Sequence, residues 1–421
     1  MSTKKGGWVT CQIGARENYI IPRIFRCSDI LKSLITDIWT PAYMRAVLNR
    51  FEVGRRLRDR FHSDLGEVDV RHFTRQFAIH ETLSKLRCGK WEHIHRVNRL
   101  FAESAGKEIV KLARRNEIQG VFAYSYAALE TFQAAKCFGL ATILGQIDAG
   151  PYAEELYEKA YGQVEGAVWD QRSRPPKVYW ESWRRECELA DLIVVNSKWS
   201  GHALQTVGIP CDKIKIVPVA FEKTDFGERR QNYRGLIPTK FSTDEPLRVI
   251  FVGSVSIEKG VHYLFQVAHT LKKEPVLFQV VGPINLTTRL LRSASANIQF
   301  LGPVPRRTVI QYLERAHLLL FPTLSDGFGI IQLEAHACGL PVVSSANCGE
   351  VVVDGQTGMV IRQLNAETIC DIIRYIVQRP DMLVEMSGRA SDRVRKFNVA
   401  RIGSLWMQAI VGMQSRERLS R

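Results

Sequence analysis

The sequence lacks the cysteine pattern of a small disulfide-bonded domain and the long apolar runs of a membrane-spanning protein. Its nine cysteines are scattered, odd in number and without a C-x-x-C pair, which argues against a disulfide framework and a zinc site. No run approaches about 18 uninterrupted apolar residues, and the opening MSTKKGGWVTCQIG has no apolar segment typical of a signal peptide. We therefore expect a cytoplasmic protein. If it contacts a lipid surface, we expect it to bind peripherally to the cytoplasmic face of the inner membrane.

The chain is longer than a typical domain and is short of acidic residues. With 421 residues and 47.9 kDa, at least two compact units are expected. Its 45% hydrophobic and 24% charged residues exclude a disordered or low-complexity chain. Asp and Glu number 43 against 58 Lys and Arg, which leaves a net charge of +15. This excess favours a negatively charged partner: nucleic acid, an anionic membrane or a phosphate-bearing small molecule.

Short apolar runs alternate with helical stretches, a pattern typical of α/β proteins with parallel sheets. In the first half the expected strands are 8–13, 67–73, 120–124, 140–144, 191–196 and 213–218. In the second half they are 247–253, 276–282, 297–302, 317–322, 341–345 and 358–361. The two series predict two Rossmann-like domains.

A polar, weakly periodic stretch separates the two series and predicts a linker. We expect a first domain over 1–225, a linker over 226–246, a second domain over 247–398 and a final helix over 399–421. The apolar stripe of this last segment includes Ile402 and Trp406, which predicts that the helix packs back on the first domain.

The window FPTLSDGFGIIQLEAHACGLPVVSS (321–345) is the most informative part of the sequence. It combines a strand end, a glycine-containing loop and a helix that begins near Ile330, with Glu334 in its first turns. Glycines let the backbone approach a ligand closely, and the N–H groups of a helix start attract anions. On these grounds alone, the window fits a phosphate-binding loop and an ordinary strand–loop–helix connection equally well.

The second half resembles the donor domain of the retaining GT-B glycosyltransferases of group 1, or family 4, of the bacterial type. The family's E-x7-E motif is matched by Asp326, the following Gly-Phe-Gly and Glu334. The family's A-x-A-x-G-x-P-V motif follows directly and ends at Val342. Three further segments are similar to those of the family, in the same order: FVGSVSIEKG, FLGPVPRRTVIQYLERAHLLLFPT and GEVVVDGQTGMVI. The resemblance implies two Rossmann-like domains that face each other across a cleft, and a hexosyl-type transferase of class EC 2.4.

The resemblance also implies roles for the matching residues. Lys259 would contact the donor diphosphate, Asp326 the transferred sugar and Glu334 the ribose hydroxyls, so Asp326 and Lys259 are the candidate catalytic residues. The other candidate donor-binding residues are Gly327, Phe328, Gly329, Ile330, Gly282, Val304, Ser254, Gly14 and Arg16.

Two positions of the second domain depart from the family pattern. Asp326 is one methylene shorter than the usual Glu, which puts the identity of the sugar in doubt. Ser254 replaces an arginine, so one of the two diphosphate cations is missing. We expect Arg16 to substitute for it, with Arg306 and Arg307 as alternatives.

The first domain resembles the family only weakly. In the stretch TILGQIDAGP, Gln146 or Ile147 stands in place of the family's histidine, and Asp148 is the only ionisable group. The candidate acceptor-site residues are Tyr124, Tyr126 and Asp148. Each also fits a structural place, a buried strand end for the tyrosines and a helix cap for Asp148.

The implied reaction moves a sugar from a nucleotide-diphosphate donor to an acceptor hydroxyl with retention at the anomeric carbon. A lipid-linked or glycan intermediate of polysaccharide biosynthesis is the expected acceptor, and a UDP- or GDP-sugar is expected as donor ahead of an ADP-sugar. Because no D-x-D motif is present, we expect neither a metal nor another cofactor. One alternative is a sugar-nucleotide epimerase or binding module of the same fold. A nucleic-acid-binding protein is the other, but its usual motifs are missing and no nucleic-acid partner is expected.

The charge excess is concentrated in residues 1–120, which hold 23 Lys and Arg against 13 Asp and Glu. Two apolar stripes in this region predict helices, one over 30–39 and one over 44–51. Four arginines follow: Arg55, Arg56, Arg58 and Arg60. Core-facing helices with solvated arginines explain the pattern, and so does a basic amphipathic face over 28–60 that docks on an anionic membrane.

Overall fold

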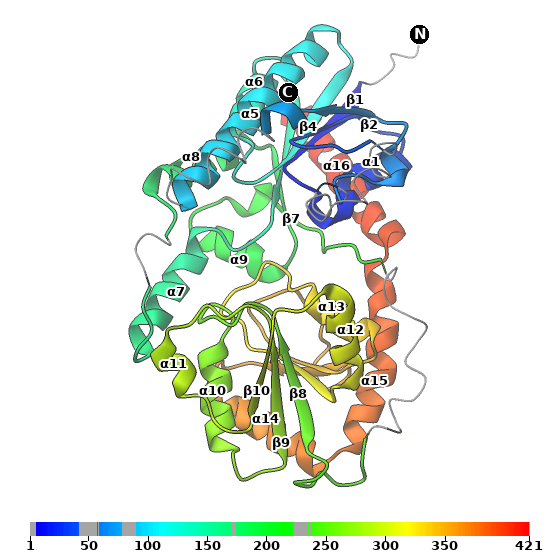
Figure 1. The fold of residues 1–421 in the computed structure, drawn as a ribbon. Helices are drawn as coiled ribbons and strands as arrows, with labels where there is room; N and C mark the ends of the chain where they lie inside the picture. The colour runs from blue at the N-terminus through cyan, green and yellow to red at the C-terminus, as the bar shows by residue number, and fades with distance from the viewer. Residues whose placement is uncertain are drawn as a thin grey trace.

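The computed structural model describes residues 6–41, 57, 59–77, 90–169, 174–222, 235 and 237–420. Two α/β domains lie end to end, the first at the top of Figure 1 and the second below it. Each domain is built around one parallel sheet flanked by helices. The α/β class and the two Rossmann-like domains expected from the sequence are therefore confirmed.

The first domain contains a seven-stranded parallel sheet in the order β3-β2-β1-β4-β5-β6-β7. Its strands are β1 (Gly7–Gln12), β2 (Leu31–Thr36), β3 (Asp69–His72), β4 (Ile118–Tyr124), β5 (Ala141–Gln146), β6 (Leu192–Val195) and β7 (Ile214–Ile216). Its longer helices are α1 (Ile20–Cys27), α5 (Lys90–Arg114), α6 (Leu129–Lys136), α7 (Pro151–Gln163), α8 (Lys177–Leu189) and α9 (Lys198–Thr206). The strand order reverses between β1 and β4, so the crevice for a ligand lies at the carboxyl ends of these strands.

One predicted helix of the first domain is a strand. The apolar stripe over 30–39 contains β2, which pairs in parallel with β1 and β3. Residues on both faces of this strand are buried, with Ser33 and Thr36 as inaccessible as Leu34 and Ile35. A strand buried on both faces is a short apolar run without alternation, which resembles a helical stripe in the sequence.

The second domain contains a six-stranded parallel sheet in the order β10-β9-β8-β11-β12-β13. Its strands are β8 (Leu247–Val252), β9 (Val276–Val281), β10 (Ile298–Gly302), β11 (Leu318–Phe321), β12 (Val342–Ser345) and β13 (Gly358–Ile361). Its helices are α10 (Val261–Thr270), α11 (Thr288–Arg292), α12 (Arg306–Arg315), α13 (Ile331–Ala337), α14 (Ala366–Gln378) and α15 (Asp381–Val394). All six predicted strands of this half are present.

The chain crosses between the domains twice, and the two crossings touch. Phe221, after the first domain, donates its backbone N–H to the carbonyl of Phe397, which ends the second domain, at 2.8 Å. The last helix, α16 (Val399–Ser420), then runs along the first domain against α1. There the Trp406 ring meets the edges of Phe25 and Phe122 at 6.0 and 5.5 Å.

The basic segment proposed for membrane contact is only partly described. The 44–51 stripe and Arg55, Arg56 and Arg58 lie outside the described residues. Arg60 does not lie in a solvated basic face, because its guanidinium pairs with the buried Asp37 at 3.2 Å. Among the helices in the described ranges, none has the length and apolar character needed to cross a bilayer.

Trp406 is expected to hold α16 on the first domain. Trp406→Ala removes a side chain that is 4% exposed and should lower the free energy of unfolding by about 3–5 kcal/mol. Val411→Ala in the same helix, at a residue 61% exposed, should change it by less than about 0.5 kcal/mol. Urea denaturation of both variants measures the difference, and equal costs would contradict the packing.

Candidate functional site

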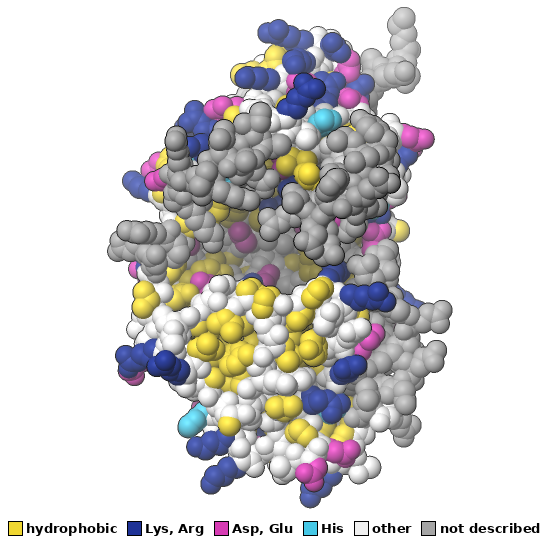
Figure 2. All heavy atoms as spheres, in the orientation of Figure 1, with side chains coloured by type: hydrophobic (Ala, Val, Ile, Leu, Met, Phe, Trp, Pro, Cys, Tyr) yellow, Lys and Arg dark blue, Asp and Glu magenta, His cyan; other side chains and the backbone are white. Residues whose placement is uncertain are grey.

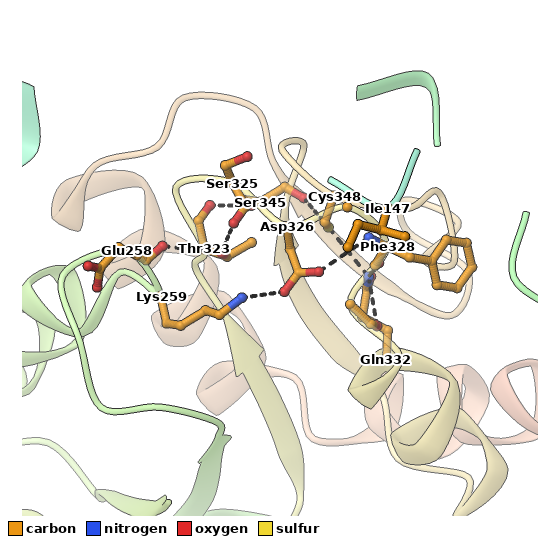
Figure 3. Close-up of polar contacts among 12 residues, drawn as sticks. Ile147, Glu258, Lys259, Thr323, Ser325, Asp326, Phe328, Gln332, Ser345 and Cys348 are labelled. Carbon is orange, nitrogen blue, oxygen red and sulfur yellow. Dashed lines mark hydrogen bonds and ion pairs between the residues drawn. The ribbon is translucent and has the colours of Figure 1, made fainter. Parts of the chain in front are cut away.

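The predicted catalytic pair comes from two loops: Asp326 lies between β11 and α13, and Lys259 lies in the turn before α10. The ammonium of Lys259 lies 2.5 Å from Oδ2 of Asp326, and Figure 3 shows the two side chains pointing at each other. The second carboxylate oxygen of Asp326 accepts the backbone N–H of Phe328 at 3.2 Å. Both side chains remain partly exposed, at 30% for Lys259 and 22% for Asp326. The pair is thus accessible to a ligand and is held in place by the loop itself.

A close backbone contact brings Lys259 to this loop. Gly260 has a left-handed φ of 76°, and a Cβ on it would lie 1.8 Å from the carbonyl oxygen of Pro322. Only glycine therefore allows the Lys259 turn to pack on the end of β11. The motif K-G seen in the sequence has this physical basis.

Buried hydrogen bonds fix the shape of the Asp326 loop. Ser345 donates to the carbonyl of Thr323 at 2.8 Å, and the Thr323 hydroxyl donates to the carbonyl of Ser325 at 3.1 Å. Gln332, fully buried in α13, donates to the carbonyl of Phe328 at 2.9 Å. Figure 3 shows these side chains surrounding the loop from three segments of the chain.

The predicted ribose ligand Glu334 carries a cationic partner. Its carboxylate lies 3.0 Å from the guanidinium of Arg306, which stands at the start of α12 just after Val304. Arg306 was one of the arginines considered for the missing diphosphate cation, and its side chain is 58% exposed. The structure therefore places an arginine beside this carboxylate of the second domain.

The other second-domain candidates line the strand ends. Ser254 accepts a hydrogen bond from the side-chain amide of Asn285 at 2.7 Å. Gly282 lies where a Cβ would be 1.8 Å from the carbonyl oxygen of Gly253, so its lack of a side chain serves backbone packing. Ile330 is exposed immediately before α13, whereas Phe328 is buried and packs on Phe397.

The first domain contacts the Asp326 loop directly, and nothing in the sequence indicated these contacts. Trp199 donates its indole N–H to the Ser325 hydroxyl at 3.0 Å, and Tyr157 donates to the Ser325 carbonyl at 3.2 Å. A Cβ on Gly327 would lie 1.8 Å from the carbonyl oxygen of Ile147. Figure 2 shows that the surface is hollowed between the two domains.

A pocket of about 280 Å³ in the first domain brings the predicted acceptor residues together. Tyr124, Tyr126, Asp148 and Arg16 all line it. The Tyr126 hydroxyl donates to Asp148 at 2.5 Å, and the Arg16 guanidinium lies 5.0 Å from the centre of the Tyr124 ring. Arg16 therefore lines this pocket, and its contact with the donor phosphates stays a prediction.

The Tyr126 wall of the pocket is held by a buried carboxylate. Glu186 accepts the backbone N–H groups of Tyr126, Ala128 and Leu129 at 2.7, 2.8 and 3.2 Å. Burial raises the pKa of Glu186 to about 8, against the three N–H donors that lower it. Tyr126 itself has a left-handed φ of 76°, a strained conformation that these bonds support.

Gly14 lies beside the first-domain pocket, where its carbonyl accepts a hydrogen bond from the side-chain amide of the lining residue Gln12 at 2.8 Å. Its N–H donates to Asp37 at 2.8 Å, and a Cβ on it would meet the guanidinium of Arg60 at 2.7 Å. Within the described ranges, no group of three or more His, Cys, Asp or Glu side chains is arranged to hold a metal ion.

The close approach of Gly327 to Ile147 gives a test of the domain contact. Gly327→Ala should force the domains or the loop apart and lower the free energy of unfolding by about 1–3 kcal/mol. Small-angle scattering should show a larger radius of gyration. Gly162→Ala, where a Cβ meets open space, is the matched control. A Gly327→Ala protein as stable and compact as the unchanged chain would refute the contact.

Comparison with known families concerns mainly the second domain. Residues 237–393 match the family model described as "Glycosyl transferases group 1". This range contains Lys259, Asp326, Glu334 and Arg306.

Curated relatives are similar over part of their length. An amylovoran biosynthesis glycosyltransferase, AmsK of Erwinia amylovora, is 24% identical over 203 residues, 44% of this chain and 47% of that protein. A D-inositol 3-phosphate glycosyltransferase of Nocardia farcinica is 28% identical over 235 residues, 50% of each. An uncharacterised 41.2 kDa protein in the cps region of Klebsiella pneumoniae is 26% identical over 49% of this chain and 57% of its own length. The chain thus spans about half the length of the curated relatives it matches.

Solved structures match the whole chain. HepE of Anabaena, in complex with UDP and glucose, superimposes with a TM-score of 0.59 at 16% identity, over 97% of this chain and 100% of that one. Sucrose-phosphate synthase of Thermosynechococcus elongatus has a TM-score of 0.64 at 14% identity, over 98% and 100%. At such low identity the likeness shows the fold alone. The chain therefore has the GT-B fold, and its residues 237–393 match the family model of the glycosyl transferases group 1.

Proposed function

We propose that this protein is a glycosyltransferase that moves a sugar from a nucleotide-diphosphate donor to an acceptor hydroxyl with retention of anomeric configuration. The observation that carries the proposal is the Lys259–Asp326 pair. This pair is partly exposed, and the loop that carries Asp326 is hydrogen-bonded to the first domain. A cation beside a carboxylate at the ends of parallel strands suits a substrate with a negative leaving group and a reacting centre that becomes positive.

Each charged residue has a distinct role in this proposal. Lys259 leaves Asp326 when the donor binds and neutralises the diphosphate, while Asp326 turns to the sugar. Glu334 accepts hydrogen bonds from the ribose hydroxyls, and Arg306, its partner, supplies the second cation that Ser254 cannot. The backbone from Gly327 to Ile330 contacts the phosphate or the sugar, and the Val304 turn lies beside the base.

The bond changes balance without a further reactant. The bond from the anomeric carbon to the diphosphate oxygen breaks, and its electron pair stays with the diphosphate. A bond to the acceptor oxygen forms, and the proton of that hydroxyl leaves with the nucleoside diphosphate. Closure of the domains excludes water, which would otherwise take the place of the acceptor.

A uridine nucleotide is the proposed donor carrier, and the acceptor is a glycan intermediate. The fold is shared with HepE, whose structures contain UDP, and the curated relatives include proteins named for amylovoran and colanic acid biosynthesis. We extend these names to a role in polysaccharide biosynthesis for this chain.

A ligand screen separates this proposal from its alternatives. UDP, GDP and ADP and their sugars are compared with a DNA duplex in a thermal-shift assay, and UDP or a UDP-sugar should raise the melting temperature most. Stabilisation by DNA alone would favour a nucleic-acid-binding protein. Turnover of the stabilising donor should persist in excess chelator, and its complete loss would contradict charge neutralisation by Lys259 and Arg306.

Replacement of Lys259 tests the site itself. Lys259→Ala should lower kcat for release of the nucleoside diphosphate by about 10²–10³-fold, because one preorganised cation is lost from the leaving group. Lys272→Ala, an exposed lysine of the same domain, should leave kcat unchanged, and both variants should retain the circular dichroism of the original protein. Unchanged turnover in Lys259→Ala would remove this residue from the site.

A further inference from the structure

The first-domain pocket has aromatic walls. Trp91, Tyr126 and Tyr179 line it, with Phe101 and Tyr124 deeper in the domain. Tyr126 and Tyr179 are stacked, with ring centres 4.9 Å apart, and Trp91 meets Tyr179 edge-on at 5.2 Å. Flat rings of this kind offer apolar faces to a flat ligand.

Two buried polar atoms in the same pocket have no partner. The side-chain oxygen of Gln12 and the hydroxyl of Ser125 make no hydrogen bond within the described part of the chain. Both residues line the pocket, and they are 1% and 5% exposed. Buried polar atoms without partners cost stability, so their presence in a pocket indicates a ligand that completes them.

Charges at the pocket balance. Arg16 contributes one positive charge and Asp148 one negative charge to its lining. Arg16 is presented by a strained turn, because Glu17, Asn18 and Tyr19 all have left-handed φ values of 49°, 52° and 59°. Strain of this kind is concentrated at ligand sites in proteins. A single arginine opposed by a carboxylate suits a neutral polar ligand better than an anion.

We infer that this pocket binds one neutral sugar ring, the terminal residue of the acceptor. A sugar ring has apolar faces for Trp91 and Tyr179 and hydroxyls that both donate, to Gln12, and accept, from Arg16. A volume of about 280 Å³, near the lower end of ligand pockets, suits one sugar ring within the pocket. A purely apolar ligand would leave the oxygens of Gln12 and Ser125 unpaired.

The pocket is joined to the Asp326 loop by a single residue. Ile147 lines the pocket, and its carbonyl oxygen is the atom closest to the Gly327 position. A ring bound in the pocket would therefore lie next to the residue that contacts the Asp326 loop. Its role as acceptor rests on the proposed function, whereas the binding of a sugar ring does not.

Direct binding measurements test the inference with defined probes. Saturation-transfer NMR is recorded for the full chain with the methyl glycosides of glucose, galactose, mannose and N-acetylglucosamine, with and without UDP. At least one glycoside should receive saturation. Trp91→Ala should reduce the affinity for it at least tenfold, Trp91→Phe should retain most of it, and Tyr375→Ala, on the exposed side of α14, should leave it unchanged.

Ser125→Ala separates a binding role from a structural one. This variant removes a buried hydroxyl without a partner, so its melting temperature should be equal or higher, while its glycoside affinity falls at least threefold. Absence of saturation for all four glycosides, or an affinity unaffected by both Trp91→Ala and Ser125→Ala, would overturn the inference. UDP binding is measured in the same samples. UDP binding without glycoside binding rejects the pocket alone, whereas glycoside binding without any nucleotide binding rejects the donor site.

Discussion

The arrangement of the site depends on a close backbone contact between the two domains, that of Gly327 with Ile147. Because position 327 has no Cβ, the loop that carries Asp326 reaches the carboxyl end of β5 in the first domain. Trp199 and Tyr157 add hydrogen bonds to Ser325 at the same point. The carboxylate, the pocket wall and the domain contact are thus adjacent to one another at a single junction.

Charges around this junction are paired within the protein. Lys259 is paired with Asp326 and Arg306 with Glu334, so each carboxylate of the site has a cation that a phosphate can compete for. Partly exposed ion pairs of this kind contribute little net free energy, so a cation can leave its carboxylate for a phosphate at little cost in free energy. In the first domain, Arg60 and Asp37 likewise form an ion pair within the protein. Net positive charge therefore says less about this site than the local pairs do.

Much of the second domain could be predicted from the sequence, because its candidate site residues lie within short, ordered motifs next to strand ends. Lys259 and Asp326 are 67 residues apart, yet each is marked by neighbouring glycines. Trp199 could not be predicted, since its partner Ser325 lies 126 residues away in another domain and no local pattern marks the pair. The β2 strand was mistaken for a helix because burial on both faces removes the alternation that identifies strands. The contact of Arg16 with Tyr124 could not be predicted either, because a sequence orders residues along a loop but does not give the direction of a side chain.

The hydrogen bond between Phe221 and Phe397 joins the two segments that connect the domains. Two adjacent tethers restrict relative motion far more than one, because they leave rotation about a shared axis and oppose twisting and separation. This axis passes beside Phe397, just before the start of α16. The helix α16 then packs on the first domain and moves with it. Rotation about this axis is therefore the relative motion of the two domains that the paired connections oppose least.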